Sequence, residues 1–245
     1  MVLLEAKGLV KRYGGRAVVN HVSIRVNQGE IVGLLGRNGA GKTTTFRMVV
    51  GMISPNAGAV SFDGHNITRM PMFKRARHGM GYLSQEPSIF QRLTVRDNLM
   101  AVMETMNLSR AARDERSEHL LDQFGLTHVA GQLARTLSGG ERRKLEIARA
   151  LVTNPVMILL DEPFSGVDPI AVQDLQKEIV ALRERGISIL LTDHNVRETL
   201  TVTDRTYIID NGKVLREGPP ADLINDELVR RTYLGNSFRG DEFSE

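Results

Sequence analysis

The chain has 245 residues, of which 41% are hydrophobic and 25% are charged, and this composition is typical of a globular protein with a substantial core. Its net charge of +3 is too small to argue for nucleic-acid binding, and the absence of cysteine excludes disulfides and thiolate metal sites. No apolar run approaches the ~20 residues that span a bilayer, and no secretory signal opens the chain, so we expect a cytoplasmic protein.

Two segments near the N-terminus have the pattern of β-strands. Apolar and polar residues alternate over 22–27, and a second short strand is expected at 60–62 between two turns. We therefore predict an antiparallel sheet from residues 1–30 and 58–68. Tyr13 lies in a polar loop, where an exposed ring could stack on a base, although a simple surface aromatic is the alternative.

The stretch 36–45 has the pattern G-x-x-x-x-G-K-T between an apolar run, 31–35, and a segment predicted to be helical. This is the phosphate-binding P-loop, in which glycines let backbone N–H groups converge on an anion at a helix N-terminus. We expect Lys42 to reach the β- and γ-phosphates and the Thr43 hydroxyl to ligate Mg²⁺. The predicted nucleotide-binding residues here are Gly36, Arg37, Asn38, Gly39, Ala40, Gly41, Lys42, Thr43 and Thr44.

Residues 69–78 are rich in basic side chains, which favours a solvated helix face over a patch that faces phospholipid or RNA. A strand then leads into a polar loop that carries Gln85. From residue 93 to 154 the pattern is helical. Ser109 is expected to cap one helix, and Ser138 has capping-box spacing to Glu141 at the start of another. Two glycines after Ser138 make this helix N-terminus a second possible anion site.

An unbroken apolar run over 156–160 predicts a strand buried on both faces, and it ends in Asp161 and Glu162. Carboxylates at this end of a parallel strand lie where α/β sheets bind ligands. Successive residues of an extended chain point in opposite directions, so we assign Asp161 to Mg²⁺ and Glu162 to the role of general base. The alternative is that two acidic residues merely end a strand.

The remaining elements complete an α/β pattern. Asp168 is expected to cap a helix that has proline at its first position, and a core strand over 187–191 leads to His194, which could contact a γ-phosphate. A hairpin with an Asn-Gly turn is predicted over 207–215. The polar segment from 226 onward is expected to be a tail, loose over its last residues.

With these motifs in order, the sequence resembles the ATP-binding subunits of ABC transporters along nearly its whole length. Leu137-Ser138-Gly139-Gly140 is similar to the signature motif of that family. The resemblance implies that Tyr13 stacks on adenine, that Gln85 links Mg²⁺ to a membrane partner, and that His194 is the switch histidine. It also implies a homodimer, in which Ser138, Gly139 and Gly140 of one copy close on the ATP held by the other.

The fold that follows is a P-loop NTPase (RecA-like) core with an antiparallel β subdomain and an inserted α-helical subdomain. We expect a single domain over 1–245. Residues 1–92 and 155–225 would form the core and β subdomain, residues 93–154 the helical subdomain, and residues 226–245 the tail.

A narrower resemblance is to the ATPase subunits of lipopolysaccharide export (Lpt) systems, carried by residues 33–45, 85–90, 161–170, 192–199 and 233–238. It implies an ATP- and Mg²⁺-dependent motor on the cytoplasmic face of the inner membrane. Coupling helices of two membrane subunits would enter a groove near Gln85 and Phe90, without direct contact with cargo or nucleic acid. Arg37 stands where that family usually has proline, and the chain runs on past Phe238.

Three other functions are weighed against this one. The ATPase of a branched-chain amino-acid importer shares the motor and a similar Tyr-Leu-Gly tail. A soluble ABC-type ATPase acting on ribosomes or DNA usually has two cassettes or a long insertion, whereas this chain has one P-loop and no such insertion. A GTPase or a regulator without turnover is disfavoured, because the chain has no guanine motif of the N-K-x-D type and keeps both carboxylates.

Overall fold

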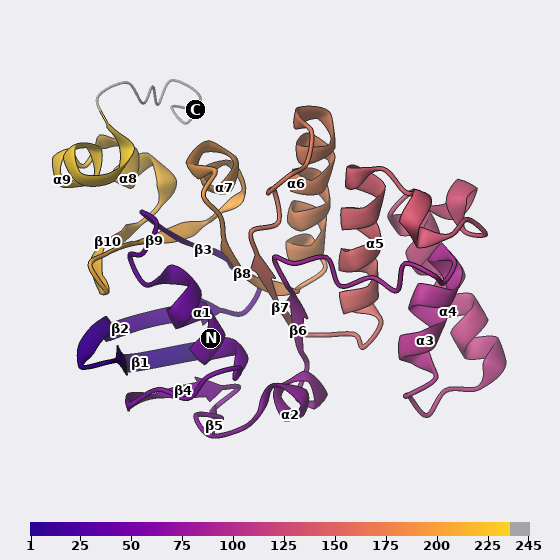
Figure 1. The fold of residues 1–245 in the computed structure, drawn as a ribbon, viewed down its shortest axis with the longest axis horizontal. Helices are drawn as coiled ribbons and strands as arrows, with labels where there is room; N and C mark the ends of the chain where they lie inside the picture. Colours follow the sequence, from indigo (N-terminus) through magenta and orange to yellow (C-terminus); the bar gives the residue numbers. More distant parts are fainter. Residues whose placement is uncertain (236–245) are drawn as a thin grey trace.

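The computed structural model describes residues 1–235, which form two β-sheets and the helices that pack against them (Figure 1). The first sheet is antiparallel with the strand order β2-β1-β4-β5. Its inward side chains alternate with exposed ones, as in Val22, Ile24 and Val26, which confirms the predicted antiparallel sheet. Its strands are β1 (Val2–Tyr13), β2 (Arg16–Asn27), β4 (Ala57–Phe62) and β5 (His65–Asn66).

The second sheet has the order β10-β9-β3-β8-β7-β6 and is parallel except for β10, which pairs antiparallel with β9. Every residue of β3, β7 and β8 is buried, as expected of parallel strands covered on both faces. The strands are β3 (Ile31–Gly36), β6 (Met80–Leu83), β7 (Met157–Asp161), β8 (Ser188–Thr192), β9 (Arg205–Asp210) and β10 (Lys213–Gly218).

Helix α1 (Lys42–Val50) lies between the two sheets. Phe46 and Val49 belong to one buried cluster with Ile24 of the first sheet and Leu34 of the second, so the helix that follows the P-loop is clamped from both sides. The other helices of this part are α2 (Met72–Arg77), α6 (Pro169–Glu184), α7 (Val196–Val202) and α8 (Pro220–Asn225).

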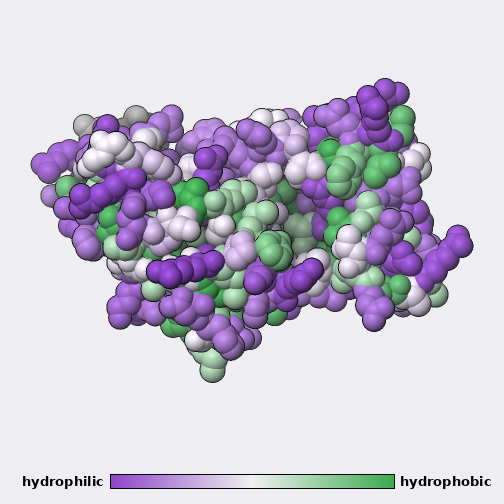
Figure 2. Space-filling model, turned by 60° about the horizontal axis from the view of Figure 1, so that its bottom comes forward, coloured by the Kyte–Doolittle hydropathy of each residue, from purple (hydrophilic) through white to green (hydrophobic). Residues whose placement is uncertain are grey.

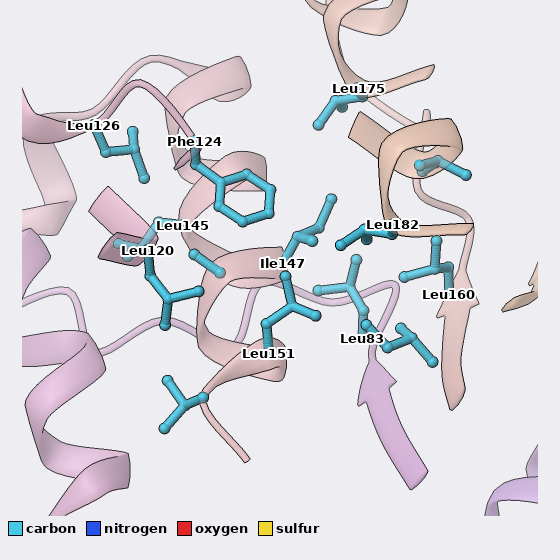
Figure 3. Close-up of a cluster of buried hydrophobic side chains, with 14 of the residues drawn as sticks. Leu83, Leu120, Phe124, Leu126, Leu145, Ile147, Leu151, Leu160, Leu175 and Leu182 are labelled. Atoms are coloured by element: carbon cyan, nitrogen blue, oxygen red, sulfur yellow. The ribbon is translucent and has the colours of Figure 1, made fainter. Parts of the chain in front are cut away.

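The helical region packs on the β6 edge of the second sheet (Figure 3). Ile147 and Leu151 of α5 face Leu83 of β6, while Phe124, just after α4, covers another side of the same cluster. Helix α5 is thereby fixed both to the sheet and to its neighbouring helices. The elements are α3 (Val95–Met103), α4 (Arg110–Gln123), α5 (Gly139–Leu151) and 3-10 turns at Thr127–Val129 and Ala134–Thr136.

Arg75 is the exception to the solvated basic face expected over 69–78, whose other basic side chains are exposed. Its side chain is buried and donates to the carbonyls of Met48 and Val49 at the end of α1, and also to that of Met70. The arginine therefore caps the C-terminus of the P-loop helix, where carbonyl groups have no helical partner. Burial without a carboxylate partner lowers its pKa to about 10.

Two further expectations change. Val156 is exposed, so the buried strand begins one residue later than expected. Residues 226–234, assigned to a tail, form α9 (Glu227–Val229) and a π-helical turn (Arg230–Leu234) that pack on a cluster with Leu35. The expectations for Phe238 and for 240–245 lie outside the described residues. Among the described helices, none is both long and apolar enough to cross a membrane.

Candidate nucleotide site

The P-loop joins the end of β3 to the start of α1 through a turn that only glycine fits at two points. Gly36 has φ 154°, and a Cβ there would lie 2.2 Å from the Ile209 carbonyl oxygen. Gly41, at the N-cap of α1, has φ 107°, and a Cβ would lie 2.7 Å from the Val18 carbonyl. No side chain caps α1 in the described structure, so its first N–H groups remain free to bind an anion.

Lys42 is buried at the first turn of α1, with its ammonium folded over the loop. Its Nζ donates to the carbonyls of Gly36 over 2.5 Å and Arg37 over 3.1 Å. Burial lowers its pKa, and the charges of Glu162 and Asp193 partly offset the effect. The Arg37 side chain is exposed.

Asp161 ends β7 as a buried carboxylate. Burial raises its pKa to about 6, and the neighbouring Glu162 adds to the rise. Asp161 and Gln85 line one cavity of about 400 Å³ together with Arg47. Oxygen donors of this kind suit Mg²⁺, which takes few protein ligands and keeps water and phosphate oxygens. The carboxylate at a cavity wall therefore fits a magnesium site.

Glu162 does not continue the extended chain of β7, which the predicted assignment of Asp161 and Glu162 assumed. The chain leaves β7 in the left-handed region, with φ 50° at Glu162, and the Glu162 amide donates to the Thr192 carbonyl over 2.7 Å. Its Oε2 accepts from Gln85 Nε2 over 2.8 Å and lies 3.3 Å from His194 Nδ1. The structure thus brings three predicted site residues, from three separate loops, to one carboxylate oxygen.

Asp193 is a site residue that the sequence analysis missed. It is fully buried and accepts from the amides of Phe164 over 3.0 Å and Asn195 over 2.9 Å. His194 Nδ1 lies 3.4 Å from its Oδ1, so Asp193 helps to place the histidine. Burial raises its pKa. Its position directly after a buried strand is the signal that could have revealed it.

Arg143 was also missed, because it appeared as one charge among several in α5. It is buried, pairs with Glu146 over 2.8 Å, and donates to the carbonyls of Asp161 and Glu162 over 3.2 and 3.0 Å. It also donates to the carbonyl of Ser84, next to Gln85. A salt bridge at i,i+3 on the apolar side of the helix is the available signal. Arg143 ties α5 to the backbone of the turn at Asp161 and Glu162.

Ser138 caps α5, and the reciprocal capping box with Glu141 is confirmed. Gly139 is exposed, whereas Gly140 is buried and a Cβ there would lie 2.8 Å from the Ala171 Cβ on α6. Figure 1 shows α5 well apart from α1, with strands of the second sheet between them. One copy of the chain therefore does not bring its own signature residues to its own P-loop.

Comparison with known protein families shows that residues 19–165 match the ABC transporter family. This match agrees with the glycine turn of the P-loop, the buried Asp161 and the motif at Ser138. The chain belongs to this family.

Relatives match the cassette over nearly its full length. It is 54% identical over 240 residues to the lipopolysaccharide export system ATP-binding protein LptB of Haemophilus influenzae, with 98% of this chain and 100% of that protein covered. LptB of Escherichia coli strain K12 is 53% identical with the same coverage. The ADP conformation of MJ1267, an ATP-binding cassette of an ABC transporter, superposes with a TM-score of 0.86 at 29% identity, covering 96% of this chain and 99% of that one.

Two aromatic residues of the cassette lie at its surface. Tyr13 is the last residue of β1, rather than part of a loop, and Lys11 Nζ lies 5.4 Å from its ring centre. Phe90 is 51% exposed, yet its backbone is held by the buried Asn98, which accepts from its amide over 2.8 Å and donates to its carbonyl over 3.1 Å. The Arg149 guanidinium lies 5.2 Å from the Phe90 ring centre. Phe90 is thus presented rigidly to solvent.

Proposed function

We propose that this cassette is the ATP-hydrolysing subunit that drives lipopolysaccharide export from the inner membrane through membrane partner subunits. The observation that carries the proposal is the identity of 53–54% with two LptB proteins, whose entire lengths are covered. The geometry at Glu162 supports hydrolysis, because a carboxylate held by Gln85 and placed beside His194 is suited to accept a proton from water.

The nucleotide would be held by the amides of 36–44 and by Lys42, with Tyr13 stacked on the base. Thr43, Gln85 and Asp161 would hold Mg²⁺, which supplies charge neutralisation at the phosphates when bound. Lys42 would turn from the loop carbonyls toward the phosphates. Supporting this assignment, no side chain caps the P-loop amides at the start of α1, and Asp161 lines a cavity together with Gln85 and Arg47 of α1.

In the proposed reaction Glu162 takes the proton of the attacking water, and His194 orients the reacting groups from the γ-phosphate side. Gln85 donates to Glu162 in this structure, so displacement of the Gln85 side chain would free that carboxylate oxygen for water. Hydrolysis would then depend on the position of the loop that carries Gln85, which is the loop nearest the proposed membrane partner.

A second copy would complete the site. Ser138 and Gly139 are exposed at the start of α5, next to the buried Gly140, and this helix end lies apart from the P-loop of the same chain (Figure 1). A homodimer arranged head to tail would place these donors on the γ-phosphate of the other copy. Two ATP molecules would then hold the two copies together.

The membrane partners would dock beside Gln85 and Phe90. Met52, Met72 and Phe73 are exposed apolar residues near α2, and Figure 2, with the side of the molecule that carries α2 turned forward, shows apolar side chains around a hollow. Exposed apolar side chains grouped in this way favour a protein interface. The cassette would thus sit on the cytoplasmic face of the inner membrane, with no direct contact with cargo or nucleic acid.

Purification of the tagged chain from its native membranes, followed by identification of the proteins that accompany it, tests the proposal. We expect two integral membrane subunits of a lipopolysaccharide exporter. Recovery with branched-chain amino-acid permeases, or with ribosomes, would overturn the transport assignment and leave the ATPase assignment standing.

Phe90→Glu tests the docking surface in the same preparation. Because the ring is exposed and its backbone is held by Asn98, the substitution should preserve folding and nucleotide affinity while the membrane subunits are lost from the complex. Val156→Glu, at a residue of similar exposure (48%), is the matched control and should retain them. A Phe90→Glu protein that still assembles and supports transport would remove Phe90 from the interface.

A further inference from the structure

The hydroxyl of Ser138 is fully engaged within its own helix end. Its Oγ donates to Glu141 Oε2 over 2.7 Å and accepts from the Glu141 amide over 3.2 Å. The same carboxylate oxygen accepts from the Ser138 amide over 2.9 Å. A serine hydroxyl has a single proton, so in this arrangement Ser138 has no O–H donor left for another partner.

An ionised phosphate oxygen accepts hydrogen bonds and cannot supply one. The proposed dimer needs Ser138 to donate to the γ-phosphate of the other copy. The Ser138 hydroxyl must therefore first break its hydrogen bond to Glu141 and turn its proton toward the phosphate. Ser138 is exposed, and rotation about its Cβ–Oγ bond is enough to redirect the proton. The Ser138 amide can keep its bond to Glu141 meanwhile, and the helix cap is preserved.

Glu141 has a second contact, with His128 in the 3-10 turn Thr127–Val129. His128 Nε2 lies 3.3 Å from Glu141 Oε1, with side-chain exposures of 67% and 29%. Hydrogen bonds from Ser138, and then the contact with His128, lower the pKa of Glu141, so its carboxylate is ionised near neutral pH. A full negative charge therefore stands directly behind the hydroxyl that would meet the triphosphate.

We infer that Glu141 is a positioning residue that holds Ser138 in a non-donating state and so raises the ATP concentration at which two copies close. His128 opposes this effect of Glu141. Its ring nitrogen contacts the second carboxylate oxygen of Glu141, which weakens the hydrogen bond from Ser138 to Glu141 and screens the negative charge of Glu141. The inference rests on the proposed ATP-driven dimer. The competing explanation is a helix cap with no part in closure, which predicts changes in stability alone.

The test uses the full chain with Glu162→Gln, so that ATP is bound without being consumed, and measures dimerisation by sedimentation across a titration of ATP with Mg²⁺. Glu141→Gln keeps an oxygen that can accept both Ser138 bonds and removes the charge. Glu141→Gln should lower the ATP concentration at half-maximal dimerisation about tenfold. Removing a partly exposed charge should change the affinity about threefold at each of the two ATP sites of the dimer. His128→Ala should raise the midpoint by about threefold or more. In the Glu141→Gln background, His128→Ala should have no effect.

Two controls separate positioning from capping. Glu118→Gln removes an exposed carboxylate that pairs with Arg96 in the same helical region, and it should leave the midpoint unchanged. Ser138→Ala removes the hydroxyl, and the effect of Glu141→Gln should shrink in that background. The melting temperatures of all variants measure how much the capping box of Ser138 and Glu141 contributes to stability.

The outcomes distinguish this inference from the proposed function. If the Glu162→Gln parent stays monomeric at saturating ATP, the proposed dimer fails and the inference fails with it. If the parent dimerises but Glu141→Gln leaves the midpoint unchanged or raises it, the inference alone is overturned, and a lowered melting temperature with an unchanged midpoint identifies a plain cap.

Discussion

The P-loop and the start of α5 are both glycine-containing turns that lead into a helix, yet the structure finishes them in opposite ways. At α1 the N-cap is Gly41 and no side chain caps the helix, so the amides are left for a ligand. At α5 the capping box uses the Ser138 hydroxyl and amide and the Glu141 amide inside the chain. The first turn has uncapped amides for an anion, whereas at the second the Ser138 hydroxyl must give up its bond to Glu141 before it can donate to one.

The difference also appears in the carboxylates nearby. Asp161 and Asp193, near the P-loop, have a raised pKa because they are buried, whereas Glu141 has a lowered pKa because Ser138 donates to it. Burial near the P-loop disfavours the ionised form of these two carboxylates, and a bound cation would stabilise that form. Hydrogen bonding at α5 has already stabilised its charge. The two regions therefore respond in opposite directions to mutation and to pH.

Glu162→Gln should have the largest effect, and this effect should be confined to the rate of ATP hydrolysis. Loss of a general base lowers turnover by about 10²–10⁴-fold, while the P-loop contacts that bind ATP remain. Single-turnover hydrolysis and equilibrium binding of a fluorescent ATP analogue measure the two quantities. Residual hydrolysis close to wild type would show that another group accepts the proton.

Gly36→Ala should destroy the P-loop turn, because its Cβ would lie 2.2 Å from the Ile209 carbonyl. We expect a loss of about 4 kcal/mol or more in the free energy of unfolding, together with loss of ATP binding. Gly39→Ala is the matched control, since its φ is 79° but no atom lies within 4 Å of a Cβ. It should cost about 1 kcal/mol. Equal costs for the two variants would contradict the steric account.

Gly140→Ala should act on packing and not on the P-loop. The added methyl would lie 2.8 Å from the Ala171 Cβ, so α5 and α6 must separate slightly, at about 1–3 kcal/mol of unfolding free energy. Gly139→Ala meets only the Gly166 carbonyl at 3.7 Å and should change stability by less than about 1 kcal/mol. Both variants should bind ATP as single copies with wild-type affinity, measured by calorimetry, and a loss of that affinity would show that α5 acts on the P-loop within one chain.

The smallest predicted effect is on the pH dependence of stability. The pKa of Asp193 in the folded protein lies above its unfolded value of about 3.9. Its contribution to the free energy of unfolding is therefore full below about pH 3.9 and is lost as the pH rises through the folded pKa. The folded pKa of Glu141 lies below about 4.3, so its contribution is full above that pH and is lost as pH falls through the folded pKa.

Asp193→Asn should therefore flatten the decline of stability toward neutral pH, and Glu141→Gln the decline toward acid. Urea unfolding of the nucleotide-free protein from about pH 3 to about pH 7 gives both slopes. Slopes that change in the same direction in the two variants would show that one of the two causes, burial or hydrogen bonding, has been misassigned.

Local patterns in the sequence were sufficient for the strands, the P-loop and the caps, because each depends on residues within a few positions of one another. The alternation over 22–27, the capping box at Ser138 and the glycine turn before Lys42 are of this kind. The reason given for assigning Asp161 and Glu162 to different roles, an extended chain, is wrong, because Glu162 lies in the left-handed region.

Only the tertiary structure decided what distant segments do to one another. Arg75 becomes the C-terminal cap of α1, and Arg143 joins α5 to the turn at Glu162, because charged groups removed from water must find carbonyl or carboxylate oxygens wherever the fold supplies them. The meeting of Gln85 and His194 at Glu162 likewise depends on the order of parallel strands, which brings their carboxyl ends to one edge. The sequence by itself determined the chemical groups of the site, and the packing of the chain determined which of them are already bonded.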